Sequence, residues 1–132
     1  MTPRRCFRSS ALRQHATAVH RLRLAAESGS VAAVAALLDP SVEMVTDGGG
    51  KTAAQARVLR APLRVAQRIC DVLETQPAAI AEREVNGESG LVLTRDGQVA
   101  AVVCVSVDRR RITDLWVVLN PDKLRHWNRP AR

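Results

Sequence analysis

The last third of the chain constrains the fold most, because tight-turn signals divide it into short apolar segments. Asn86-Gly87 and Asp96-Gly97 supply the positive φ angles that two-residue hairpin turns need. The segments around these turns predict strands at 79–85, 90–94, 98–107 and 112–119. Strands joined by such short turns form an antiparallel meander.

Two of these predicted strands are apolar on both faces. Nearly every residue of 99–107 is apolar, and so is every residue of 115–119. A strand of this kind must be covered on both sides. We expect helices on one side and a second copy of the chain on the other, which predicts a homodimer packed sheet to sheet. The alternative is that the C-terminal tail folds back over the second face.

The remaining sequence predicts helices and one or two strands. Apolar spacing and capping residues predict helices at about 10–28, 31–38 and 62–73, a strand at 42–46 and a weaker extended segment at 57–59. Asp39-Pro40 is expected to stop the second helix. Helices followed by a meander predict an α+β sandwich. The boundaries are a flexible lead-in at 1–9, one domain at 10–127 and a tail at 128–132.

Composition excludes several classes of function. The formal net charge is +7, but many arginines lie near the ends and no recognition motif accompanies them, so nucleic-acid binding by this domain alone is not expected. The three cysteines are not clustered, which argues against a disulfide framework, a zinc site or another metal site. We expect a cytoplasmic protein with reduced thiols, no cofactor and no membrane span.

Three motifs lie at predicted element boundaries. Asp47-Gly48-Gly49-Gly50-Lys51 follows the first strand, 85–93 (VNGESGLVL) forms the first hairpin, and Asn120-Pro121-Asp122-Lys123-Leu124 follows the last strand. Together they resemble the C-terminal SnoaL-like domain of one group of extracytoplasmic-function sigma factors. The resemblance covers about residues 11–127.

The resemblance implies a nuclear-transport-factor-2-like cone, in which a curved antiparallel sheet and about three helices enclose a pocket. It also implies a regulatory module that contacts a transcription-related protein through the segments 47–51 and 120–124. A chain of 132 residues has no room for the two DNA-binding regions that precede this domain in those sigma factors. We therefore expect a free-standing relative or a fragment of a longer protein, without promoter recognition of its own.

The first and the last of these three motifs, 47–51 and 120–124, also have a purely structural interpretation. The glycines after Asp47 suit unusual backbone angles at a strand end, and a P-loop is excluded because position 45 is valine. The other interpretation is a surface for a protein or an anion, with Lys51 as its charge. Asn120 suits a helix cap with Pro121 at the first helical position and Asp122 in the first turn.

Catalysis in such a cone would need an acid or base facing the pocket. The candidate bases are Asp47 and Asp114, and the expected pocket residues are His20, Met44, Ile69 and Trp116. Strand alternation predicts that Asp114 and Trp116 line the interior together. The chain has no tyrosine to serve as an oxyanion donor. The sequence therefore favours a non-catalytic module that binds a small hydrophobic ligand or a protein, and the alternative is an isomerase, cyclase or hydrolase acting on a hydrophobic metabolite.

Overall fold

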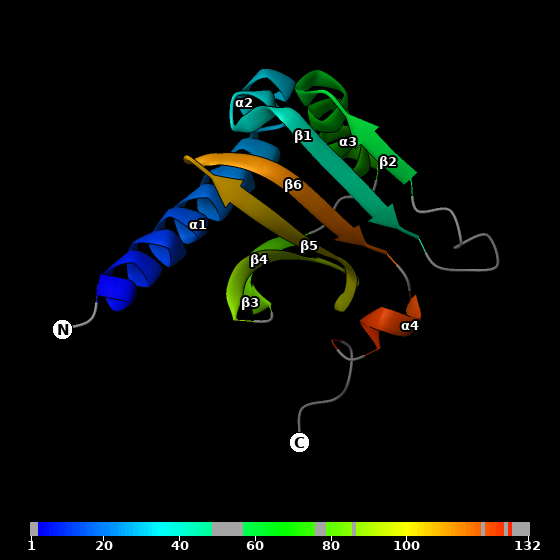
Figure 1. The fold of residues 1–132 in the computed structure, drawn as a ribbon. Coiled ribbons are helices and arrows are strands. Elements are labelled where there is room, and N and C mark those ends of the chain that lie inside the picture. The colour runs from blue at the N-terminus through cyan, green and yellow to red at the C-terminus, as the bar shows by residue number, and fades with distance from the viewer. Residues whose placement is uncertain are drawn as a thin grey trace.

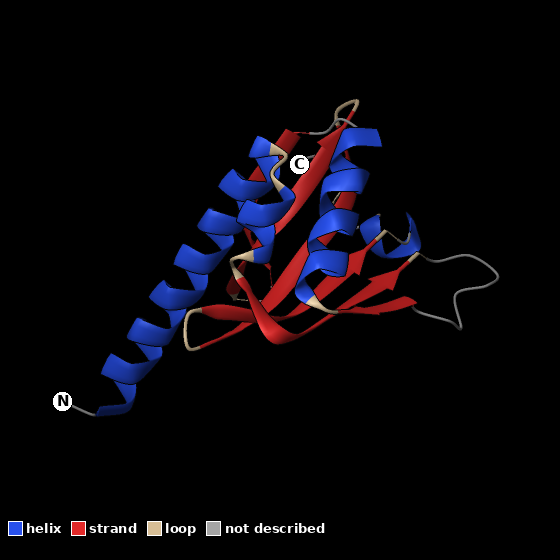
Figure 2. Ribbon diagram, turned by 90° about the horizontal axis from the view of Figure 1, so that it is seen from above, coloured by secondary structure: helices blue, strands red, loops and turns tan. Residues whose placement is uncertain are grey.

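The computed structural model describes residues 3–48, 57–75, 79–85, 87–119, 121–125 and 127. In chain order the elements are α1 (Pro3–Ser28), α2 (Val31–Ala35), β1 (Leu38–Asp47), β2 (Arg57–Arg60), α3 (Pro62–Thr75), β3 (Ala79–Val85), β4 (Glu88–Arg95), β5 (Gln98–Asp108), β6 (Arg111–Val118) and α4 (Pro121–Leu124). The helices α1, α2 and α3 pack on one face of a strongly curved sheet, and α4 lies beyond the end of β6 (Figures 1 and 2). The predicted α+β cone is confirmed.

The strands form one sheet in the order β2-β1-β6-β5-β4-β3. The meander β3 to β6 is antiparallel throughout, as its turn signals predict. One ladder differs from the antiparallel expectation, because β1 runs parallel to β6. The reason is topological: the chain leaves β1 through β2, α3 and the strands β3 to β5 before β6 returns beside it (Figure 1).

The second helix is shorter than predicted, and the first strand is longer. α2 ends at Ala35, and β1 begins at Leu38 instead of 42. The N–H of Ile112 donates to the carbonyl of Leu37, so this segment joins the sheet edge rather than continuing a helix. The register shifts between Leu38 and Glu43, which lets Pro40 lie in the strand without donating to the ladder.

The first helix begins earlier than predicted. α1 starts at Pro3, so the expected lead-in at 1–9 is helical from that residue onward, and its flexibility stays a prediction. Gly29 ends α1 with a φ of 72°, and the Ser30 side chain caps α2 by accepting a hydrogen bond from Ala33 at 3.1 Å. This tight connection takes the chain from α1 into α2 across two residues, Gly29 and Ser30. None of the helices the structure describes is both long and apolar enough to cross a membrane.

The core lies between the helices and the inner face of the sheet. Its largest fully buried side chains are Val19, Leu22, Val34, Leu38, Val42, Val65, Ile112 and Leu115. A second, smaller cluster lies on the outer face, where Leu124 of α4 packs with Val92 and Val102. In the hairpin motif, Gly90 is required sterically, since a Cβ there would lie 2.9 Å from the carbonyl oxygen of Val103.

Candidate functional site

The inner face of the sheet encloses a partly open cavity beneath α1 and α3. Its volume is about 60 Å³. The lining residues come from most elements of the cone: Leu22, Ala26, Met44, Thr46, Arg68, Ile69, Val72, Leu73, Ile80, Leu91, Leu93, Ala101, Val103, Leu115, Val117 and Leu119. The buried members form its floor, whereas Ile69, Val72 and Leu119 are half-buried and Arg68 is exposed. The cavity therefore opens to solvent beside α3.

The cavity exists because the cone is built from short side chains. The chain has only one phenylalanine, no tyrosine, and two tryptophans that lie outside the lining. Ala26 and Ala101 are buried at positions where a larger residue would fill the space. Aliphatic side chains of this size pack the walls but leave the centre of the curved sheet unoccupied.

The chemistry of the lining is nearly uniform. Among the described residues that line the cavity, only Thr46 and Arg68 carry a hydroxyl or a charge, and none carries a carboxylate. Arg68 is a cavity residue that was not predicted from the sequence. The available signal was its place directly before Ile69, at the border of the apolar face of α3. Among the described residues, Arg68 forms no ion pair.

Two of the four expected pocket residues line the cavity. Met44 is buried in β1, and Ile69 lies on α3. His20 is instead exposed on α1, where its Nδ1 lies 2.8 Å from Oε2 of Glu82. The same oxygen accepts a hydrogen bond from Nε of Arg23 at 2.6 Å. Burial would raise the pKa of Glu82, but hydrogen bonds from His20 and Arg23 outweigh it and hold that pKa below its ordinary value.

Trp116 and Asp114 face away from the cavity, contrary to the prediction. Leu115 and Val117 line it, and Trp116 is 44% exposed on the opposite face. The register explains the error, because Ser106 pairs with Asp114 while the next residue of β5 pairs with Ile112. This bulge breaks the alternation counted from Ile112. The hydroxyl of Thr113 donates to Oδ2 of Asp114 at 3.0 Å.

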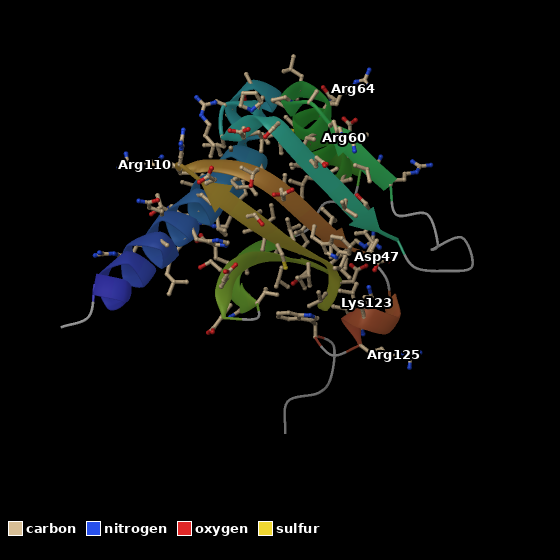
Figure 3. All side chains as sticks on the ribbon, in the orientation of Figure 1. Asp47, Arg60, Arg64, Arg110, Lys123 and Arg125 are labelled. Atoms are coloured by element: carbon tan, nitrogen blue, oxygen red, sulfur yellow. The ribbon has the colours of Figure 1, made fainter. Side chains whose placement is uncertain are left out.

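Asp47 of the first motif and Lys123 of the last motif meet at one edge of the molecule. Nζ of Lys123 lies 2.5 Å from Oδ2 of Asp47, and the N–H of Leu119 donates to the carbonyl of Asp47 at 2.7 Å (Figure 3). Asp47 is therefore a structural ion-pair partner outside the cavity lining. Gly48 is exposed, and a side chain there would meet nothing within 4 Å.

Gly49, Gly50, Lys51 and Asn120 lie outside the described residues. Pro121 and Asp122 begin α4, as the capping pattern predicts. The part of the chain that the structure describes holds no cluster of residues suited to a metal ion.

Comparison with solved structures identifies the fold. The chain is similar to the extracytoplasmic function sigma factor SigJ of Mycobacterium tuberculosis at a TM-score of 0.64 and 25% identity, over 83% of this chain and 43% of that one. It thus spans less than half of that sigma factor. No protein-family model matches the chain, and the comparison with curated proteins found no match.

Two other similar structures extend over nearly their whole length. An NTF-2 like protein from Burkholderia xenovorans has a TM-score of 0.60 at 11% identity, covering 92% of this chain and 98% of that one. An LEH-like epoxide hydrolase of M. tuberculosis has a TM-score of 0.55 at 15% identity, covering 87% and 89%. At such identities the likeness shows the fold alone. The order of elements, the cone and these likenesses together show that the chain has the nuclear transport factor 2-like fold that the resemblance to SnoaL-like domains implies.

Proposed function

We propose that this domain is a non-catalytic binding module whose cavity takes a small hydrophobic ligand with an acidic end group. The observation that carries the proposal is the cavity lining, whose described residues are apolar apart from Thr46 and Arg68. An apolar wall favours a hydrocarbon body, because burying it removes apolar surface from water.

The position of Arg68 supports the acidic end group. Its side chain lines the cavity while the residue remains exposed at the opening beside α3. A ligand with its apolar part inside would place its polar end near this guanidinium. Arginine binds a carboxylate through two parallel hydrogen bonds. Without a protein carboxylate paired to it among the described residues, Arg68 has this capacity available.

The lining also disfavours the enzymatic alternative. Proton abstraction in the cavity would need a base there, and neither candidate carboxylate lines it. Asp47 pairs with Lys123, and Asp114 is exposed on the outer face. An isomerase, cyclase or hydrolase remains the second candidate on the ground of fold, since the epoxide hydrolase of M. tuberculosis shares it.

A role in transcription is the regulatory part of the proposal. The likeness to the sigma factor SigJ supports it, together with the meeting of the two motif segments at Asp47 and Lys123. We propose that this edge docks a transcription-related protein in the cytoplasm. A ligand in the cavity would then act on the docking edge through β1 and β6, which line the cavity and lead to Asp47 and α4.

Homodimerisation through the outer face is the proposed assembly. Leu124 covers part of that face, while Trp116 and Val58 remain 44% and 45% exposed. Native mass spectrometry of the wild type and of Trp116→Glu tests this. We expect a wild-type dimer and a monomeric variant, because a charge in an apolar interface is costly. A monomeric wild type would contradict the assembly without affecting the cavity.

Ligand-observed NMR titration tests the cavity with hexanoate and 1-hexanol, which differ in the acidic end group. We expect hexanoate to bind about fivefold more tightly, the scale of one exposed charge-assisted contact. Arg68→Gln should remove this preference. Arg64→Gln is the matched control, because Arg64 is exposed on the same helix but does not line the cavity.

The outcomes separate the parts of the proposal. Equal binding of both compounds would keep the hydrophobic cavity and exclude the acidic ligand class. Binding of neither would contradict the ligand-binding function. Conversion of an added hydrophobic epoxide or ketone at a defined rate, lost in Asp47→Asn or Asp114→Asn, would favour the enzyme instead.

A further inference from the structure

We propose that a second site, separate from the cavity, binds a phosphate group of a small phosphorylated ligand. The site is a hollow of about 270 Å³ between α1 and the turn that joins β5 to β6. Its lining is Arg13, Gln14, Thr17, Arg21 and Arg110. It therefore presents three guanidinium groups, an amide and a hydroxyl, all of which can donate hydrogen bonds.

Two separate elements bring these donors together. Arg13, Thr17 and Arg21 follow one another at intervals of four residues, so they share one face of α1. Arg110 comes from the β5–β6 turn, which lies against that helix in Figure 3. Donors that converge on one hollow from a helix and a hairpin are typical of a binding site, whereas a solvated helix face would use the helix alone.

No carboxylate is among the described residues that line the hollow. Among the described residues, no carboxylate forms an ion pair with Arg13, Arg21 or Arg110. Arg23, on the same helix, shows the contrast, because it pairs with Glu27 at 2.8 Å and with Glu82 at 2.6 Å. Guanidinium groups that share a hollow repel one another. A bound anion would relieve this repulsion.

The turn carrying Arg110 has an unfavourable residue choice for its backbone. Asp108 pairs with Arg111, which leaves Arg109 and Arg110 as a two-residue loop with φ angles of 49° and 67°. Such turns favour Asn-Gly or Asp-Gly. The preceding hairpin follows that preference, with Asp96-Gly97 at 52° and 77°. The strained backbone of the two arginines in the β5–β6 turn points to a role for an arginine side chain there.

The donor set favours phosphate over other anions. Arginine binds phosphate oxygens bidentately, and the neighbouring amide and hydroxyl can satisfy further oxygens. The hollow is bounded by two elements, which suits a compact ligand better than an extended polymer. The proposal does not depend on the apolar cavity, because the two sites share no lining residue.

Isothermal titration of the full chain with inorganic pyrophosphate tests the site. We expect Arg110→Gly to weaken binding about tenfold, since it removes a charged donor while giving the turn a favourable residue. Arg109→Asn is the matched control: it removes the same charge from the same turn, but Arg109 does not line the hollow. We expect it to change affinity less than about twofold. Circular dichroism should show both variants folded.

Three results would overturn the proposal. One is absence of pyrophosphate binding by the wild type at low salt. Another is an equal loss in Arg109→Asn and Arg110→Gly, which would indicate diffuse attraction to net positive charge. The third is that a single-stranded oligonucleotide binds far more tightly than pyrophosphate and has the same affinity for both variants. This result would make the surface a general nucleic-acid contact.

Discussion

Leu115 and Trp116 are neighbours on β6, and they show how differently the two faces of the sheet are used. Leu115 is 2% exposed against the cavity, and Trp116 is 44% exposed on the outer face. The chain covers its inner face with α1 to α3 and leaves the cavity there, while α4 is the only element among the described residues that covers part of the outer face. This difference underlies the proposal that the inner face takes a small ligand and the outer face another protein chain.

The largest expected effect comes from truncating this pair. Leu115→Ala should lower the free energy of unfolding by about 3 kcal/mol, because it removes a fully buried side chain beside an existing cavity. Trp116→Ala is the control on the next residue and should cost less than about 1 kcal/mol in a monomer. Urea unfolding at low protein concentration measures both. Equal costs would contradict the difference between the faces.

Removing the tail contact should have a smaller effect. Leu124 is 4% exposed on the outer cluster, so Leu124→Ala should cost about 2 kcal/mol of unfolding free energy. Cys104 packs against the same cluster. Burial, the larger cause, and the charge of Glu88, the smaller one, raise the pKa of its thiol. The variant should therefore react faster with a thiol reagent at Cys104 than the wild type. An unchanged rate would mean that α4 does not shield this face.

The β5–β6 turn gives a prediction of opposite sign. Arg109→Asn with Arg110→Gly should raise the free energy of unfolding by about 1 kcal/mol, because left-handed backbone angles are unfavourable for arginine. Thermal unfolding measures the gain. If the double variant were no more stable than the wild type, the turn would store no strain, and that support for the phosphate site would be lost.

The smallest effect concerns the ion pairs between α1 and β3. The hydrogen bonds from His20 and Arg23 keep the pKa of Glu82 below its ordinary value of 4.5. These hydrogen bonds contribute to the free energy of unfolding at pH values above 4.5. The contribution is lost as the pH falls through the lower pKa that Glu82 has in the folded state. Solvent limits it to a few tenths of a kcal/mol. Glu82→Gln should reduce the dependence of the free energy of unfolding on pH below 4.5. The same pH dependence in variant and wild type would mean that the contacts of Glu82 with His20 and Arg23 do not stabilise the fold.

The meander was predictable because its signals are local. Two Gly-containing turns set the strand boundaries, and Pro62 and Pro77 bracket the third helix in the sequence. The parallel ladder between β1 and β6 could not be predicted in this way, since it joins segments far apart in the chain. Local capping rules also predicted too long a second helix. The pairing of Leu38 with Ile112 places the end of that predicted helix in the sheet instead.

The site was less predictable than the fold. Met44 and Ile69 follow from apolar periodicity, and the structure places both at the cavity. Trp116 was misplaced by a single bulge, which exchanges the faces of every residue after it. Arg68 precedes an apolar residue of α3, but so does Arg64, the other arginine of that helix, so this local signal does not separate the two. The structure separates them, because Arg68 lines the cavity and Arg64 does not.

Methyl NMR of the protein titrated with hexanoate tests the difference between the faces most directly. We predict that the methyl signals of Met44, Ile69 and Leu115 shift together, with a common affinity, because all three line the cavity. The signals of Val58 and Leu124 on the outer face should stay unchanged. Shifts confined to Val58 and Leu124, or no shift at saturating hexanoate, would contradict a ligand site on the inner face of the sheet.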